Sequence, residues 1–210
     1  MQDIGQFTIR EIDSKEKKLI KEIAKVHVQT FKGFFLTFMG KGFLTTMYRA
    51  YCRHSDSSLL GAVSSEGQVL GFLAYSKNMS GLYKYMIKRS LLPFFWYSLC
   101  AFFRNPKVFV RLIRAFLKPS EAKREESYIE LSSIGVSPDV KANGIGTQLI
   151  NSLKDREKVS GYNYISLETD AKDNEIANAF YKKNGFILER VYQTKEKREM
   201  KEYRFYLEQA

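Results

Sequence analysis

A glycine-rich segment between a predicted strand and a predicted helix has the composition of an anion-binding loop. The apolar run 129–136 predicts a strand, and the segment KANGIGT at 141–147 leads into an amphipathic stretch that reaches Leu153. The first backbone N–H groups of a helix have no acceptor within the helix, and glycine allows a ligand to approach the backbone closely. We therefore expect this junction to bind a phosphate group.

A second motif follows about thirty residues later, formed by Asn174, Ala177, Tyr181, Gly185 and Phe186. The sequence around it predicts a short helix, because Asp173 is a suitable N-cap and Ile176 and Phe180 have helical spacing. Asn184 and Gly185 are a typical helix end. Tyr181 then lies in the last turn of this helix.

The spacing of residues within the two motifs distinguishes between the known families of phosphate-binding proteins. The loop lacks the Gly-Lys-Ser/Thr ending of nucleotide hydrolases and one glycine of the dinucleotide fingerprint. The remaining pattern is basic-or-Gln-x-x-Gly-x-Gly, followed by Asn-x-x-Ala-x-x-x-Tyr-x-x-x-Gly-Phe, and in both motifs the sequence resembles the GNAT acetyltransferase superfamily. The first loop position is normally Arg or Gln in that superfamily, so Lys141 departs mildly from its pattern.

This resemblance implies acetyl-coenzyme A as cofactor. The superfamily holds the pyrophosphate on loop amides and the pantetheine arm on backbone groups at a splay between its fourth and fifth strands. Asn174 is expected to hydrogen-bond the pantetheine or its neighbouring strand, or, alternatively, to cap its own helix. The cofactor-binding residues implied are Ile134, Gly135, Val136, Lys141, Asn143, Gly144, Ile145, Gly146, Thr147, Asn174 and Tyr181.

Acetyl transfer to an amine needs a base for the amine proton and benefits from an acid for the departing thiolate. By resemblance, Glu130 falls where some members place a catalytic glutamate, and Tyr181 matches the general acid of many members. Alternation along a strand would put Glu130, Ser132, Ile134 and Val136 on one face. The alternatives are a carboxylate paired with a lysine and a tyrosine that only packs against the cofactor.

The acceptor site is expected among the N-terminal helices. His27 shares a helical row with apolar residues and precedes an aromatic loop, so it is either a core histidine, a substrate ligand or an alternative base. The predicted substrate-binding residues are His27, Phe31, Phe34 and Phe35. This stretch resembles a GNAT subgroup associated with bacterial surface-polysaccharide assembly, which implies an amino sugar or sugar nucleotide. Arg49 and Arg53 are either contacts for its phosphates or a solvated helix face.

Other acceptors and other classes of function stay open at this point. They are a small-molecule amine in general, a protein or peptide amine, and a non-catalytic acyl-coenzyme A-binding or membrane-peripheral protein. The composition bears on where the protein is expected to work. The 210 residues carry a formal net charge of +11, and the N-terminus has no apolar signal segment. Cys52, Cys100, His27 and His54 show no metal-ligand spacing, so we expect no metal and a cytoplasmic protein.

Residues 79–126 are predicted to be a basic, aromatic helical insertion. Between Leu82 and Lys118 there are eight cations and no acid, and 91–103 is apolar but shorter than the ~20 residues of a spanning helix. A basic amphipathic helix is predicted from Asn105 to Pro119. We expect either peripheral membrane contact through 82–118 or a solvated cationic rim. Nucleic-acid binding is not expected, because no recognition module accompanies the charge.

The predicted elements form one N-acetyltransferase domain over residues 1–210. Periodicity predicts strands at 7–12, 59–63, 68–75, 129–136, 162–168, 186–192 and 199–207, with helices at 15–31 and 41–51 and one after each of the two motifs. This order resembles a GNAT fold with a helical insertion before its fourth strand. The implied fold is α/β, with a central, mixed, mostly antiparallel sheet that splays into a V between strands 4 and 5 and is flanked by helices.

Overall fold

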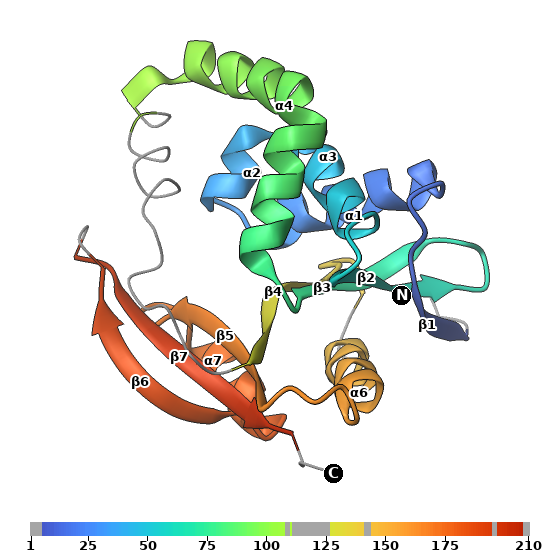
Figure 1. The fold of residues 1–210 in the computed structure, drawn as a ribbon, viewed down its shortest axis with the longest axis vertical. Helices are drawn as coiled ribbons and strands as arrows, with labels where there is room; N and C mark the ends of the chain where they lie inside the picture. The colour runs from blue at the N-terminus through green and yellow to red at the C-terminus, as the bar shows by residue number, and fades with distance from the viewer. Residues whose placement is uncertain (1–5, 108–109, 111–126, 141–143, 195–196, 208–210) are drawn as a thin grey trace.

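The computed structural model describes residues 6–107, 110, 127–140, 144–194 and 197–207, and strands and helices are interspersed along the chain (Figure 1). The elements before the insertion are β1 (Phe7–Glu11), α1 (Lys17–Thr30), α2 (Phe35–Met39), α3 (Lys41–Tyr51), β2 (Ser57–Ser64) and β3 (Val69–Ser76). The remaining ones are α4 (Met79–Arg104), β4 (Tyr128–Val136), α6 (Ile145–Glu157), β5 (Tyr164–Asp170), α7 (Glu175–Lys183), β6 (Ile187–Gln193) and β7 (Glu199–Tyr206).

The seven strands form one sheet in the order β1-β2-β3-β4-β5-β7-β6. Neighbouring strands are antiparallel except β4 and β5, which are parallel and pair only from Tyr128–Tyr164 to Glu130–Ser166. Beyond that point the two strands separate, and β5, β7 and β6 turn away from the rest of the sheet (Figure 1). The mixed sheet, its V-shaped splay and the helix before β4 confirm the predicted GNAT-like architecture.

Hydrophobic packing covers both faces of the sheet. On one face α1 and α3 bury residues such as Ile23, Leu44 and Tyr48 against β2 and β3. On the other face α6 buries Leu149, Ile150 and Leu153 against β3, β4 and β5. The segment after α1 was predicted as an aromatic loop, but part of it forms the short helix α2.

The predicted common face of Glu130, Ser132, Ile134 and Val136 is wrong. Tyr75 of β3 pairs with Leu131 and Ala74 pairs with Ser133, so β4 carries one additional residue at Ser132. Because side chains alternate along a strand, one inserted residue exchanges the two faces. Ile129 and Leu131 before the bulge and Ile134 and Val136 after it therefore pack on the α6 side. Glu130 lies on the opposite side, within electrostatic reach of Tyr51 and Tyr83.

The insertion begins with one long, kinked helix. Asn78 caps α4 by accepting a hydrogen bond from the Gly81 N–H (2.8 Å), and Ser90 has non-helical dihedral angles (φ −133°, ψ 23°). Pro93 accounts for the kink, because it cannot donate a helical hydrogen bond. The predicted apolar segment 91–103 is thus the second half of α4. The helix predicted from Asn105 to Pro119 falls largely outside the described residues.

Helix α4 is seated on α3 at a glycine. A Cβ atom added to Gly42 would lie 2.2 Å from the Tyr97 ring, and Phe43 contacts Phe94 with ring centroids 4.8 Å apart. The ring of Tyr97 therefore occupies the space that a side chain at position 42 would need. Despite its 26 residues, α4 is not apolar enough to cross a membrane, and neither is any other helix in the described part of the chain.

Candidate active site

A cleft of about 1030 Å³ opens where β4 and β5 separate. Its walls come from Leu131–Val136 of β4, Leu167–Asp170 of β5, the first turn of α6, the helix α7 and the end of α1. It brings together most of the predicted site residues, namely His27, Phe31, Phe34, Ile134, Gly135, Val136, Gly144, Ile145, Gly146, Thr147, Asn174 and Tyr181. Lys141 and Asn143 lie outside the described residues, as does the side chain of Phe35.

The first turn of α6 offers backbone donors to the cleft. Gly144 is the N-cap residue in a left-handed conformation (φ +68°), and no described side chain caps the helix. The first bond of α6 runs from the Gln148 N–H to the Gly144 carbonyl (2.9 Å), so the N–H groups at 145–147 precede the helical ladder. Together with the positive end of the helix dipole, these donors suit a phosphate group.

The edge of β4 along the cleft is open, because its pairing with β5 stops at Glu130. Backbone groups at 131–136 that point toward β5 can therefore bind the amide groups of a ligand. The Val136 carbonyl already accepts a hydrogen bond from the Thr30 hydroxyl (3.1 Å). A Cβ atom at Gly135 would lie 2.9 Å from the Phe72 ring and 3.3 Å from that of Phe31, so this position has no room for a side chain.

Helix α7 is fastened to the end of β5 by two asparagines. The Asn174 side chain donates to the Thr169 hydroxyl (2.6 Å), and that of Asn178 donates to the Asp170 carbonyl (3.1 Å). The predicted N-cap Asp173 is wrong: Asn174 occupies the N-cap position without a side-chain capping bond. Asp173 instead takes a left-handed conformation (φ +53°), which aspartate tolerates better than most residues.

Tyr181 lies in the last turn of α7 and faces the cleft from an aromatic environment. Its ring contacts Phe180, Phe186 and Tyr203, with centroids 5.5 to 6.0 Å apart. Burial disfavours the phenolate and raises the pKa of Tyr181 to about 12. At neutral pH the hydroxyl is therefore protonated and able to donate.

Glu130 is not among the residues that line the cleft. It pairs with Ser166 in the last parallel contact between β4 and β5, at the closed end of the V. The next residue, Leu131, is the first of β4 to line the cleft. Any contact between Glu130 and a ligand in the cleft would have to pass through a bridging group such as water.

Comparison of the sequence with protein-family models identifies the family to which this cleft belongs. A family model described as the acetyltransferase (GNAT) family matches residues 27–186, which contain both motifs, β4 and the splay. The chain belongs to the GNAT acetyltransferase family. A comparison with curated protein sequences finds no match.

Solved structures show the same fold at low sequence identity. A GNAT-family protein from Desulfovibrio desulfuricans is 14% identical, with a TM-score of 0.60, over 96% of this chain and 99% of that one. Arabidopsis thaliana NAA60, solved with acetyl-CoA, is 15% identical, with a TM-score of 0.56, over 96% and 98%. The ribosomal-protein-S18-alanine N-acetyltransferase from Escherichia coli is 13% identical, with a TM-score of 0.57, over 98% and 96%.

Acetyl-CoA is the acetyl donor of this GNAT domain, and the cleft fits it on two independent features. The free donors at the start of α6 suit the pyrophosphate, and the open edge of β4 suits the amide-rich pantetheine arm. Gly146 leaves little room for a side chain, because a Cβ atom there would lie 3.1 Å from the Phe180 ring of α7. Among the described residues no group of His, Cys, Asp or Glu could hold a metal ion.

His27 lines the cleft and is almost fully buried, with 3% of its surface exposed. Its Nδ1 is 2.6 Å from the Tyr48 hydroxyl, which is 3.5 Å from the Ser133 hydroxyl, while its Nε2 has no partner among the described residues. Burial lowers the pKa of His27 to about 4. The ring is therefore neutral at pH 7.

Sequence reasoning did not identify the ion pair of Asp170 and Arg198, which also lines the cleft. Arg198 contacts the Asp170 carboxylate through two guanidinium nitrogens, and its guanidinium carbon lies 5.9 Å from the centre of the Phe34 ring. The pair thus connects the β5–β7 half of the sheet to the loop after α1. No local signal marks it, because antiparallel pairing of β5 with β7 brings the two residues together.

Replacement of Gly144 with valine should weaken acetyl-CoA binding by roughly tenfold or more, because the loop amides would leave their positions and charged hydrogen bonds would be lost. The left-handed conformation at 144 is unfavourable for valine. Isothermal calorimetry measures the affinity. Gly67→Val is a matched control, since Gly67 also has a positive φ (+78°) and open space around it but lies in the β2–β3 turn. Unchanged affinity in folded Gly144→Val would contradict the assignment.

Stability should fall between pH 7 and pH 5 because of His27. Its folded pKa of about 4 is below the usual value of 6.5, so over this interval the unfolded chain binds a proton that the folded chain does not. The loss begins as pH drops through 6.5, is complete near 4, and amounts to on the order of 2 kcal/mol at pH 5. In urea denaturation, His27→Gln should show a correspondingly smaller loss; equal losses in both proteins would exclude this role.

Proposed function

We propose that the protein transfers an acetyl group from acetyl-CoA to the primary amine of an amino sugar, most favourably one linked to a nucleotide. Acetyl-CoA-dependent N-acetylation is the general activity of its family. The observation that carries the choice of acceptor is the pairing of an aromatic wall with an ionic one within the cleft. His27, Phe31 and Phe34 form the first, and Asp170 with Arg198 forms the second.

The two walls suit the two kinds of surface on a sugar. The exposed Phe34 ring lies 5.7 Å from the Phe31 ring, so the two can contact the C–H groups of a pyranose, while the His27 ring, 4.6 Å from that of Phe31, is almost fully buried. The Asp170 carboxylate and the Arg198 guanidinium can accept from and donate to hydroxyl groups. The formal charge of +11 supports an anionic acceptor, because a positive protein attracts it from solution.

For proton transfer we propose Tyr181 as the acid and Glu130 as the base. Acetyl-CoA supplies the thioester carbonyl; the amine must lose a proton, and the thiolate that departs must gain one. Tyr181 lines the cleft with a protonated hydroxyl. Glu130 would act through water from the closed end of the V, and His27, neutral and with an unpartnered Nε2, is the alternative base.

A protein or peptide amine is the second candidate acceptor. The likeness to the Escherichia coli enzyme that acetylates an alanine of ribosomal protein S18 shows the shared fold, and the open V could admit an extended chain. The charge of the protein argues against polyamines, since like charges repel.

We also propose that the protein works in the cytoplasm and contacts the inner face of a membrane through residues 82–118. Support comes from α4, where Leu92 and Phe103 are 79% and 76% exposed. Side chains of this kind seldom stay in water without a partner surface.

Release of coenzyme A in the presence of a panel of amines tests the proposed acceptor. We expect turnover with amino-sugar nucleotides, a mass gain of one acetyl group on the sugar amine, and little turnover with peptides or spermidine. Phe34→Ala, which removes one ring of the aromatic wall, should raise the KM for the sugar while leaving the affinity for acetyl-CoA unchanged. Turnover confined to peptides would reject the sugar acceptor in favour of the second candidate.

Tyr181→Phe should lower kcat by roughly 10²–10⁴-fold with little change in the Kd for acetyl-CoA, because only the proton donor is lost. Wild-type kcat should show no decline from Tyr181 ionisation at pH values well below its pKa of about 12. Tyr162→Phe, outside the cleft, is the control and should keep the wild-type kcat.

Glu130→Gln and His27→Gln, each assayed from pH 6 to 9, separate the two base candidates. If Glu130 is the base, kcat should fall by roughly 10²–10⁴-fold in Glu130→Gln and stay unchanged in His27→Gln. Full activity of Glu130→Gln at every pH would assign proton removal to His27 or to water alone.

A further inference from the structure

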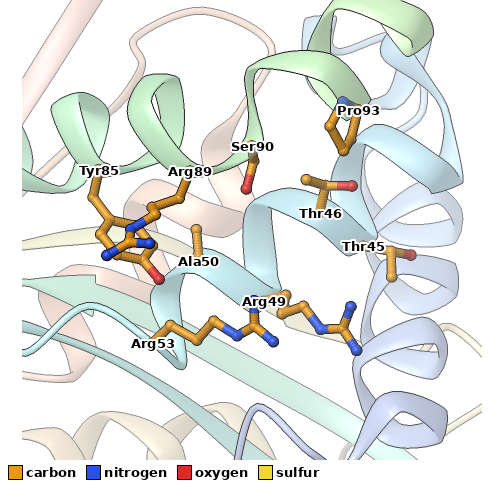
Figure 2. A pocket seen from close by; sticks show the side chains of 9 residues that line it. All are labelled: Thr45, Thr46, Arg49, Ala50, Arg53, Tyr85, Arg89, Ser90 and Pro93. Carbon is orange, nitrogen blue, oxygen red and sulfur yellow. The ribbon is translucent and has the colours of Figure 1, made fainter.

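A second pocket lies between α3 and α4 and shares no residue with the cleft between β4 and β5. Its volume of about 200 Å³ is enough for a phosphate group. Figure 2 shows its lining side chains, which are Thr45, Thr46, Arg49, Ala50, Arg53, Tyr85, Arg89, Ser90 and Pro93.

Three arginines dominate the charge of this arginine pocket. Arg49 lies on α3, Arg53 lies in the turn just after α3, and Arg89 comes from α4 (Figure 2). Like charges gathered in one pocket repel one another. No ion pair in the described part of the chain includes any of the three, and no carboxylate lines the pocket. An anion in the pocket would relieve this repulsion and satisfy planar donors that suit phosphate oxygens.

The kink in α4 places the arginine pocket beside an exposed apolar surface. Ser90 and Pro93 line the pocket, and the two residues between them, Leu91 and Leu92, are 58% and 79% exposed. From here the second half of α4 runs along the outside of the molecule (Figure 1). The apolar face of α4 consists of the exposed Leu91, Leu92, Phe95, Trp96 and Phe103.

We propose that α3 and α4 form a membrane-docking surface in which the apolar face of α4 enters the lipid interface and the arginine pocket holds the phosphate of an anionic lipid headgroup. The proposal rests on the peripheral contact proposed above and names its partner. Exposed aromatic and aliphatic side chains beside cations are typical of helices that lie in a membrane interface.

Charge favours a lipid surface over a second copy of the chain as the occupant of this face. The sequence has no acidic residue from Lys41 to Ser55 or from Met79 to Lys107, so both helices of the surface are purely basic. Two copies meeting here would bring like charges together, whereas the surface of an anionic bilayer attracts each cation.

Sedimentation of the full chain with vesicles tests the proposal. The vesicles are phosphatidylcholine alone, or phosphatidylcholine with phosphatidylserine or phosphatidic acid. Wild type should bind the anionic vesicles and bind the neutral ones far less. The variant Arg49→Gln, Arg53→Gln, Arg89→Gln should bind anionic vesicles on the order of a hundredfold more weakly.

The matched control, Lys84→Gln, Lys88→Gln, Lys107→Gln, changes the net charge equally but leaves the arginine pocket intact. It should lose clearly less affinity than the arginine variant. A third variant, Leu92→Asn, Phe95→Asn, Trp96→Asn, should lose binding to every vesicle. Calorimetry with acetyl-CoA, which does not involve this surface, should give wild-type affinity for all three and so confirm that they are folded.

Equal losses in the arginine and lysine variants would overturn the arginine pocket as a site and leave attraction by net charge alone. Saturable binding of inorganic phosphate by wild type without vesicle binding would show a soluble ligand instead of a lipid. A dimer that the third variant dissociates, without vesicle binding by wild type, would show that a second copy covers the face. Failure of the acceptor assay would not affect these results, since vesicle binding requires neither acceptor nor turnover.

Discussion

The active site depends on a short piece of strand pairing. β4 and β5 are hydrogen-bonded partners only as far as Glu130 and Ser166, and both strands continue beyond that point. A sheet interior normally satisfies its own backbone groups, so two strands that separate leave donors and acceptors that a ligand can use. The cleft and the backbone contacts expected for pantetheine both follow from this separation.

The helices α6 and α7 lie on either side of the splay and are held in place by packing and hydrogen bonds. α6 packs on β3 and β4 through Ile145 and Leu149, which fixes its first turn at the edge of the cleft. α7 is held by Asn174 and Asn178 at the end of β5, and Phe180 meets the backbone of α6 at Gly146. The N–H groups at the start of α6 and Tyr181, the proposed acid, are therefore carried by separate halves of the sheet, and their spacing is set by helix packing.

Local patterns in the sequence predicted much of this arrangement. The helix after the glycine loop, the short helix around Tyr181 and most strands depend on periodicity and turn residues within a few positions, and they lie near their predicted bounds. The bulge at Ser132 was not predictable in this way, because it is a property of the register between β3 and β4. The ion pair of Asp170 and Arg198 likewise requires the pairing of β5 with β7 to be known. The kink at Ser90 had a local cause in Pro93, but only the structure shows a pocket beside it.

The bulge at Ser132 also constrains how β4 can change over evolutionary time. The residues before it and those after it contribute to the same core only because the additional residue restores the alternation. A single-residue deletion on either side of the bulge would exchange the apolar and polar faces over part of β4, which lines the cleft. Relatives of this chain should therefore differ in β4 by substitution and keep its length.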